Sequence, residues 1–95
     1  MHIILKSNFD VAGIFEKGHI ELDGSDVTLR QLLDQLSRQT KGTMELVSPK
    51  TKEVNPEDFS VSLNGMEYPF LPGRLETRLK EGDVVEVSIT VLGGG

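Results

Sequence analysis

Cysteine and tryptophan are absent from this sequence of 95 residues, and its aromatic residues are one tyrosine and four phenylalanines. Without cysteine, the chain can form no disulfide and no thiolate metal site, and it has no thiol nucleophile of its own. Any sulfur chemistry in which the protein takes part must therefore use sulfur that another molecule supplies.

Positive charge is also scarce. The sequence has 10 lysines and arginines against 15 aspartates and glutamates, which gives a formal net charge of −5. Proteins that bind nucleic acid need a clustered positive surface to replace the counterions of the phosphate backbone. The composition therefore argues against a nucleic-acid partner, and a basic protein is a better match for the acidic surface.

Long apolar runs are missing as well. No segment approaches the roughly 18 consecutive apolar residues of a membrane-spanning helix, and the N-terminal "MHIILK" is too short for the apolar region of a secretory signal. With 37% hydrophobic and 26% charged residues, the chain has the composition of a globular protein. We expect one folded domain in the cytoplasm, without a membrane partner.

Side chains that could catalyse a reaction are scattered. His2 and His19 do not form a metal-binding spacing such as HxxH, and exposed strand histidines are the simpler interpretation. The serines lack the glycine-flanked context of a nucleophile elbow, and the carboxylates are spread over predicted faces and loops. We therefore expect no metal, no bound cofactor and no enzymatic activity of the chain alone.

One helix is clearly indicated, over residues 28–40. Thr28 and Gln31 have the spacing of a capping box, and Gly42 is placed to end the helix. The apolar residues recur at the i, i+3, i+4 and i+7 positions of one helical face. They are Leu29, Leu32, Leu33 and Leu36.

Several segments alternate apolar and polar residues as strands do. An Asn64-Gly65 turn joins two of them, and Pro69 and Pro72 restrict the second arm of that hairpin to a sheet edge. The segment 43–58 fits either a small hairpin or a loop. The predicted strands cover residues 1–7, 19–24, 59–63, a short return arm after Gly65, and 84–92.

The order of these elements predicts an α+β domain, because a single helix separates an early hairpin from later strands. We expect a mixed sheet of four or five strands, with the first strand beside the last and the helix packed across one face. In the last strand, alternation places Val85, Val87, Ile89 and Val91 on the buried side.

The final predicted strand runs directly into three glycines. Glycine lets a backbone enter a narrow channel because it has no side chain to collide with the walls, and a glycine carboxylate is the least hindered acyl group of a chain. The four residues from Leu92 to Gly95 reach about 13 Å when extended. The tail can thus enter another protein's active site, although glycines are also typical of a frayed terminus.

These motifs together resemble one family. "VSLNG" at 61–65, followed by "LKEGDVVEVSITVLGGG" at 79–95, resembles the pattern of the ubiquitin-like β-grasp sulfur carriers of the MoaD/ThiS family, which includes the small subunit of molybdopterin synthase. The first strand and the "TLRQLLDQL" helix fit as well, so the resemblance covers nearly the whole chain. It implies a β-grasp domain over residues 1–92 and a flexible glycine tail over residues 93–95.

The resemblance implies a carrier rather than an enzyme. A ubiquitin-activating-type enzyme would use ATP to turn the Gly95 carboxylate into an acyl adenylate. A persulfide from a sulfurtransferase would then leave a thiocarboxylate, and a client enzyme would take the sulfur. Chain length favours the molybdopterin-synthase and cysteine-route types over the thiamine type. We expect the large subunit of molybdopterin synthase as the client, and carriers for thiamine or cysteine synthesis are the alternatives. The family pattern ends in two glycines, so Gly94 is the working terminus if Gly95 is removed.

Two other functions fit the same residues. A ubiquitin-like protein modifier would be adenylated in the same way but would end in an isopeptide bond to a substrate lysine, and a plain binding module would make no use of its tail. For a carrier, we expect the partner surface on the sheet face away from the helix, on the proline-interrupted return arm and on the tail. The expected contact residues are Met66, Tyr68, Phe70, Leu92, Gly93 and Gly94.

Overall fold

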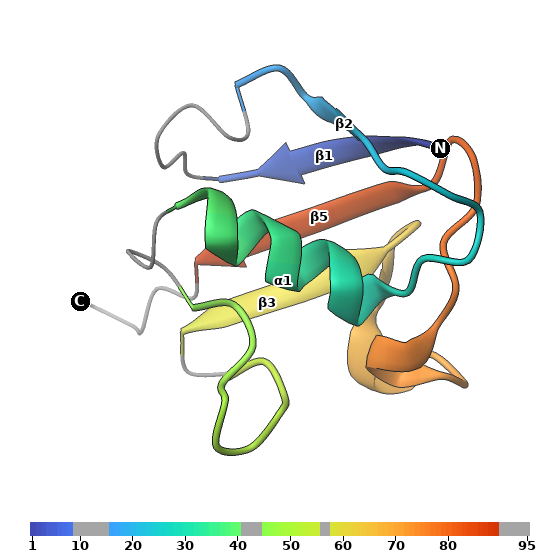
Figure 1. Ribbon diagram of the computed structural model, residues 1–95. Coiled ribbons are helices and arrows are strands. Elements are labelled where there is room, and N and C mark those ends of the chain that lie inside the picture. Colours follow the sequence, from blue (N-terminus) through green and yellow to red (C-terminus); the bar gives the residue numbers. More distant parts are fainter. Residues whose placement is uncertain (9–15, 41–44, 56–57, 90–95) are drawn as a thin grey trace.

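The computed structural model describes residues 1–8, 16–40, 45–55 and 58–89. One α-helix and five strands account for most of the regular structure in these ranges (Figure 1). The strands are β1 (His2–Ser7), β2 (His19–Glu21), β3 (Phe59–Leu63), β4 (Met66–Glu67) and β5 (Val84–Ile89), and the helix is α1 (Leu29–Gln39). None of the helices in this part of the chain is long and apolar enough to cross a membrane.

The five strands form one mixed sheet in the order β2-β1-β5-β3-β4. β1 and β5 are parallel, with Leu5 paired with Val85, and the other neighbours are antiparallel. The last strand of the sequence therefore lies in the centre of the sheet, beside the first. This arrangement confirms the predicted mixed sheet and the predicted pairing of the two terminal strands.

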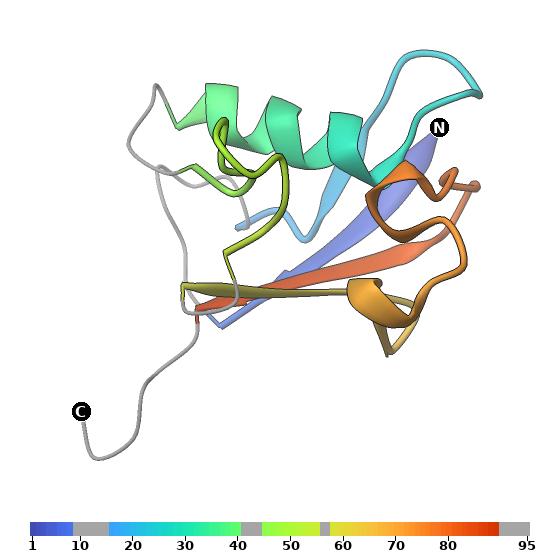
Figure 2. The same ribbon diagram turned by 90° about the horizontal axis from the view of Figure 1, so that it is seen from below.

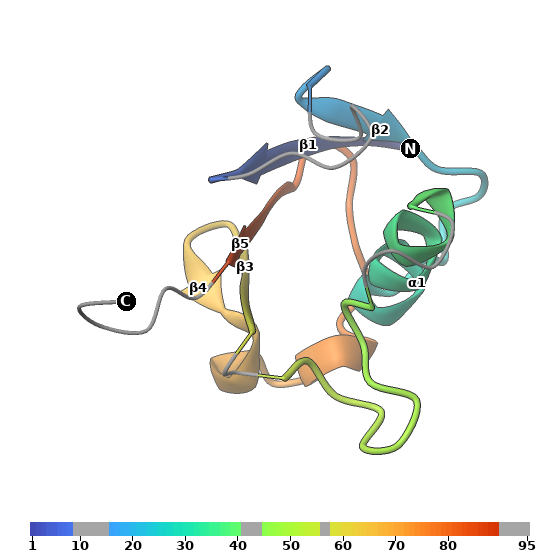
Figure 3. The same cartoon turned by 90° about the vertical axis from the view of Figure 1, so that its left-hand side faces the viewer.

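Helix α1 covers one face of the sheet (Figure 2), and viewed from the end the strands curve around the side on which it lies (Figure 3). Its four predicted leucines are fully buried. The capping box is present, because the backbone N–H of Gln31 donates to the Thr28 hydroxyl and the Thr28 N–H donates to the Gln31 side chain. The helix ends at Gln39, with Thr40 as its C-cap, and Gly42 lies outside the described residues.

The core between α1 and the sheet consists of the residues that alternate along the strands. Ile3 and Leu5 of β1, Val61 of β3, and Val85 and Val87 of β5 are at most 3% exposed. The residues that alternate with them, such as Lys6, Ser62 and Glu86, have their side chains on the opposite face, as the period of two requires. A single hydrophobic core is thus built largely from local sequence patterns.

The sequence of segment 43–58 fits either a small hairpin or a loop. Its residues 45–55 contain no strand. Leu46 and Val54 are nevertheless buried, at 0% and 2% exposure. The backbone N–H of Leu46 donates to the hydroxyl of Ser37 at the end of α1. This loop therefore closes one side of the core by inserting two apolar side chains rather than by adding strands.

The predicted hairpin at Asn64-Gly65 is confirmed. Both residues have positive φ, 52° and 88°, which is the requirement of the tight turn that joins β3 to β4. β4 is the edge strand, and Pro69 lies in a short 3₁₀ helix, η1 (Tyr68–Phe70), where the chain leaves the sheet. The proline interruption therefore acts as expected.

The connector between the hairpin and β5 is anchored by two buried leucines. Leu75, in the 3₁₀ helix η2 (Arg74–Glu76), is 1% exposed, and Leu79 is 3% exposed. The backbone N–H of Leu29 donates to the carbonyl of Thr77, and that of Leu79 donates to the carbonyl of Val27. These bonds attach the connector to the start of α1 and set the position at which β5 begins.

One expectation about β5 is wrong. Alternation placed Ile89 on the buried side, but its side chain is 41% exposed. The cause is its place at the rim of the sheet, since β1 pairing ends with Ser7 opposite Val87 and β3 begins with Phe59 opposite Ile89. Val91 and the rest of the predicted strand lie outside the described residues.

Candidate functional site

The candidate site is the end of β5, where the chain continues into the glycine segment. β5 is held between β1 and β3, and Ile89 is its last residue. The predicted site residues Leu92, Gly93, Gly94 and Gly95 all lie outside the described residues. The structure therefore places Ile89, the residue after which this segment begins.

Two asparagine side chains hold the two ends of β5. At the start, the backbone N–H of Val84 donates to the Asn64 side-chain oxygen over 2.9 Å, and the Asn64 side-chain amide donates to Asp83 over 3.0 Å. At the end, Asn8 makes two hydrogen bonds with the backbone of Ile89. Neither asparagine was predicted as a site residue, because its contact depends on a strand that is remote in sequence.

The return arm exposes two of its three predicted contact residues. Met66 is 49% exposed and Phe70 is 73% exposed. Tyr68, which we expected on the contact surface, is only 7% exposed and belongs to the core. Its hydroxyl lies 3.5 Å from the carbonyl of Val54. It lies in η1, whose turn directs its ring inward and leaves Phe70 outside. The apolar part of the surface is thus Met66 and Phe70.

The sheet face away from α1 is mostly polar. The strand register aligns one row of side chains across it, and Ile4 and Val84 are half-buried neighbours on the same face. The row consists of Lys6, Glu86, Ser62 and Glu67. Apolar residues that could contact a partner are therefore concentrated on the return arm and at Ile89 rather than in the middle of this face.

The two histidines, predicted to be isolated, are neighbours in the fold. Their rings stack with centroids 4.8 Å apart, and Nδ1 of His2 lies 2.5 Å from Oε1 of Glu21. This hydrogen bond lowers the pKa of the Glu21 carboxyl below its usual value. Within the described ranges, no group of three or more histidine or acidic side chains could hold a metal ion.

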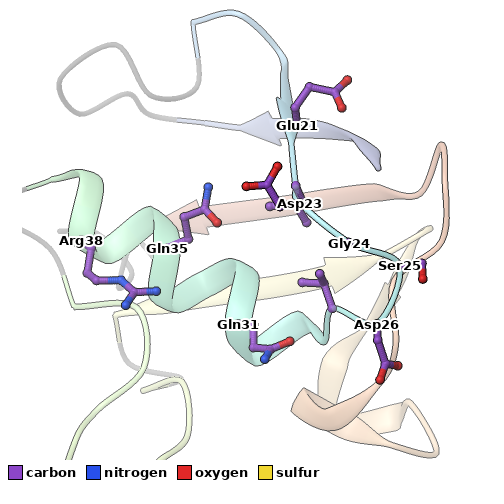
Figure 4. A pocket seen from close by; sticks show the side chains of 10 residues that line it. Glu21, Asp23, Gly24, Ser25, Asp26, Gln31, Gln35 and Arg38 are labelled. Carbon is purple, nitrogen blue, oxygen red and sulfur yellow. The ribbon is translucent and has the colours of Figure 1, made fainter.

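An acidic hollow of about 450 Å³ lies between β2, the loop after it and α1 (Figure 4). Glu21, Asp23 and Asp26 line it on the strand and loop side, and Gln31 and Arg38 line it from the helix. The sequence had suggested that carboxylates are spread over separate faces and loops. The fold instead brings three of them to one depression, although its lining contains no histidine or cysteine that could act in catalysis.

Comparison with known proteins relates this chain to one protein family. The sequence pattern of the ThiS family matches residues 8–95. A protein of Archaeoglobus fulgidus named "Putative sulfur carrier protein" is 33% identical over 78 residues, which cover 82% of this chain and 86% of that protein.

Solved structures agree on the architecture. SAMP1 from Haloferax volcanii has a TM-score of 0.69 at 20% identity, and the match covers 99% of this chain and 100% of that one. A chain of the Amycolatopsis orientalis BexX/CysO complex has a TM-score of 0.65 at 19% identity, over 97% and 99% of the two chains. With the mixed sheet and single helix, these likenesses confirm the predicted β-grasp fold.

Proposed function

The chain belongs to the ThiS family, and on this premise we propose that it is a sulfur carrier whose Gly95 carboxylate is converted into a thiocarboxylate. The observation that carries the proposal is the position of β5. This strand pairs with β1 on one side and with β3 on the other. Residue 90 therefore follows the end of a central, well-held strand, which supports the delivery of residues 90–95 to the active site of a partner.

The first proposed step is activation by a ubiquitin-activating-type enzyme, because a carboxylate is a poor acyl donor. A carboxylate oxygen of Gly95 attacks the α-phosphorus of ATP, and pyrophosphate leaves. The acyl carbon is then bonded to AMP, which is a good leaving group. The partner binds the ATP, so the carrier itself needs no cofactor and is a substrate rather than an enzyme.

In the second proposed step, sulfur replaces AMP. The outer sulfur of a persulfide on a sulfurtransferase attacks the acyl carbon, AMP leaves, and an acyl disulfide forms. A second thiol then attacks the sulfur of the donor, forms a disulfide with it and releases the thiocarboxylate on Gly95. Because the carrier has no cysteine, no thiol of its own competes for the activated acyl carbon.

Partner contacts are proposed at the return arm and along the tail. Met66 and Phe70 are exposed apolar side chains, and exposed apolar patches mark docking surfaces. Leu92, Gly93 and Gly94 would lie in the partner's channel, where residues without bulky side chains fit best. The BexX/CysO complex, in which a chain of this fold has a partner, supports a docking role.

The client that we propose is the large subunit of molybdopterin synthase, since chain length favours this type and the cysteine-route type over the thiamine type. Enzymes of thiamine or cysteine synthesis are the alternative clients, and incubation of the thiocarboxylate with each in turn separates them. We propose the cytoplasm as the site of action because the activation step consumes ATP.

Protein modification is the second candidate, and the likeness to SAMP1, one of the small archaeal modifier proteins, favours keeping it. The same adenylate would then be attacked by a lysine ε-amino group of a substrate protein, and an isopeptide bond would form as AMP leaves. The two functions differ in their product. A carrier regains its carboxylate after sulfur release, whereas a modifier accumulates as a lysine-linked adduct.

Exchange of labelled pyrophosphate into ATP tests the activation step. With the ubiquitin-activating-type enzyme of the same organism, the full chain should support exchange, and a chain that lacks Gly94 and Gly95 should support none. A bulky residue in place of Gly94 should suppress exchange nearly as strongly, because a β-carbon there would meet the channel wall. Exchange that persists without the two glycines would contradict the proposal.

A further inference from the structure

The backbone of Ile89 lies beyond the last residue pair of the ladder between β1 and β5. The N–H of Asn64 donates to the carbonyl of Val84, so Val84, Glu86 and Ser88 direct their backbone groups toward β3. Alternate residues of a strand face opposite neighbours, and Ile89 therefore faces β1. The last pairing of β1 with β5, however, joins Ser7 to Val87, two residues earlier.

The side chain of Asn8 forms the hydrogen bonds that a paired residue of β1 would otherwise form with Ile89. Its Oδ1 accepts a hydrogen bond from the backbone N–H of Ile89 over 2.9 Å, and its Nδ2 donates to the carbonyl of Ile89 over 3.3 Å. One side-chain amide thus satisfies both the donor and the acceptor of the last residue of β5. A primary amide can do this because it carries a donor and an acceptor side by side.

We propose that Asn8 is a positioning residue for the C-terminal tail. By holding both backbone groups of Ile89, it fixes the point and the direction from which residues 90–95 begin. This inference rests on the proposed function, since it assigns Asn8 a role in presenting Gly95 to the activating enzyme. Asn8 itself touches no reacting atom.

The role follows from the cost of ordering a chain when it binds. Six residues, 90–95, follow Ile89, and they reach at most about 20 Å when extended. If Ile89 is released, the backbone entropy of one further residue must be lost when the tail enters its channel. The effect therefore belongs to binding and not to the chemical step.

The steady-state kinetics of adenylation test this role through the Asn8→Ala variant of the full chain. The KM for the carrier should rise about five-fold, the effect of ordering one further residue, while kcat stays unchanged. Amide hydrogen exchange should become faster at Ile89 and remain unchanged at Val85, in the buried middle of β5. Asn8→Asp should have a smaller effect on exchange, because it keeps the acceptor for the Ile89 N–H and loses only the donor.

Asn64→Ala is the matched control, because it removes the asparagine that holds the opposite end of β5. It should lower the stability of the protein but leave the KM for the carrier unchanged under folding conditions. A similar rise in KM for both variants would show a general loss of stability and overturn the proposal. So would an unchanged KM in Asn8→Ala despite faster exchange at Ile89.

Failure of the proposed function and failure of the role of Asn8 give different experimental results. If the activating enzyme does not accept the wild-type chain at all, the proposed function is wrong, and the assignment of Asn8 as a positioning residue for activation is overturned with it. If the wild-type chain is activated and Asn8→Ala behaves like the wild type, only the role of Asn8 is wrong.

Discussion

At the scale of single residues, burial decides which side chains of the return arm can contact another protein. Tyr68 and Phe70 are two positions apart, yet the first is 7% exposed and the second 73%. The turn of η1 directs them to opposite sides of the chain. An aromatic side chain in the core stabilises the fold, whereas one on the surface is available for binding.

The contrast between these two residues gives the first prediction. Phe70→Ala should weaken binding to the activating enzyme about ten-fold or more, as the loss of an interface anchor does, and change the free energy of unfolding by less than about 0.5 kcal/mol. Tyr68→Ala should cost about 3 to 5 kcal/mol of stability. Titration calorimetry and urea unfolding measure the two effects, and unchanged affinity in Phe70→Ala would remove it from the partner surface.

A second residue-scale prediction concerns Glu21, whose pKa is lowered by the hydrogen bond with His2. A carboxyl with a lowered folded-state pKa adds stability above its unfolded pKa, near the ordinary value of 4.5, and loses it as the pH falls through the folded-state value. As the pH falls from above the unfolded pKa to below the folded-state pKa, Glu21→Gln should therefore lose less stability than the wild type. Urea unfolding over a pH series measures this difference.

Glu67→Gln is the control for the Glu21 variant, because it removes an exposed carboxylate from the edge strand β4. It should follow the wild-type pH dependence more closely than Glu21→Gln does. Identical acid profiles for the wild type and Glu21→Gln would mean that the contact with His2 has no energetic effect.

At the scale of elements, local patterns were sufficient for α1, the hairpin turn and the central strands. The leucine spacing, the capping box and Asn64-Gly65 each act over a few residues, so their outcome could be predicted without knowledge of the fold. The contact of Asn8 with Ile89 joins residues 81 positions apart and depends on the parallel pairing of β1 with β5. Tyr68 was misplaced because strand alternation does not extend into η1.

Helix α1 supplies a prediction at this scale. Leu33 is fully buried against the sheet, so Leu33→Ala should cost about 2 to 5 kcal/mol through lost burial and the cavity that it leaves. Asp34→Ala, on the exposed side of the same helical turn, should change stability by less than about 0.5 kcal/mol. Chemical denaturation of both variants checks the difference, and equal costs would contradict the packing of this face.

At the scale of the whole molecule, the domain and its glycine segment have separable roles. Within the described residues, the hydrophobic core extends from Ile3 of β1 to Val87 of β5. At the candidate site, the position of the last strand beside the first could be predicted, whereas its place in the centre of the sheet comes from the structure. The partner surface could not, because exposure on the return arm depends on how η1 packs against the loop that carries Val54.

The central claim is that Gly95 carries sulfur, and intact-mass measurement of the carrier tests it most directly. After incubation with the activating enzyme, ATP and a persulfide donor, the full chain should gain the mass difference between one sulfur and one oxygen. It should return to its original mass when a client takes the sulfur. The chain without Gly94 and Gly95 should remain folded, because glycine has no side chain to bury and terminal residues tolerate truncation, and its mass should not change on incubation. A wild-type mass that never changes, or an equal gain in the truncated chain, would contradict the account.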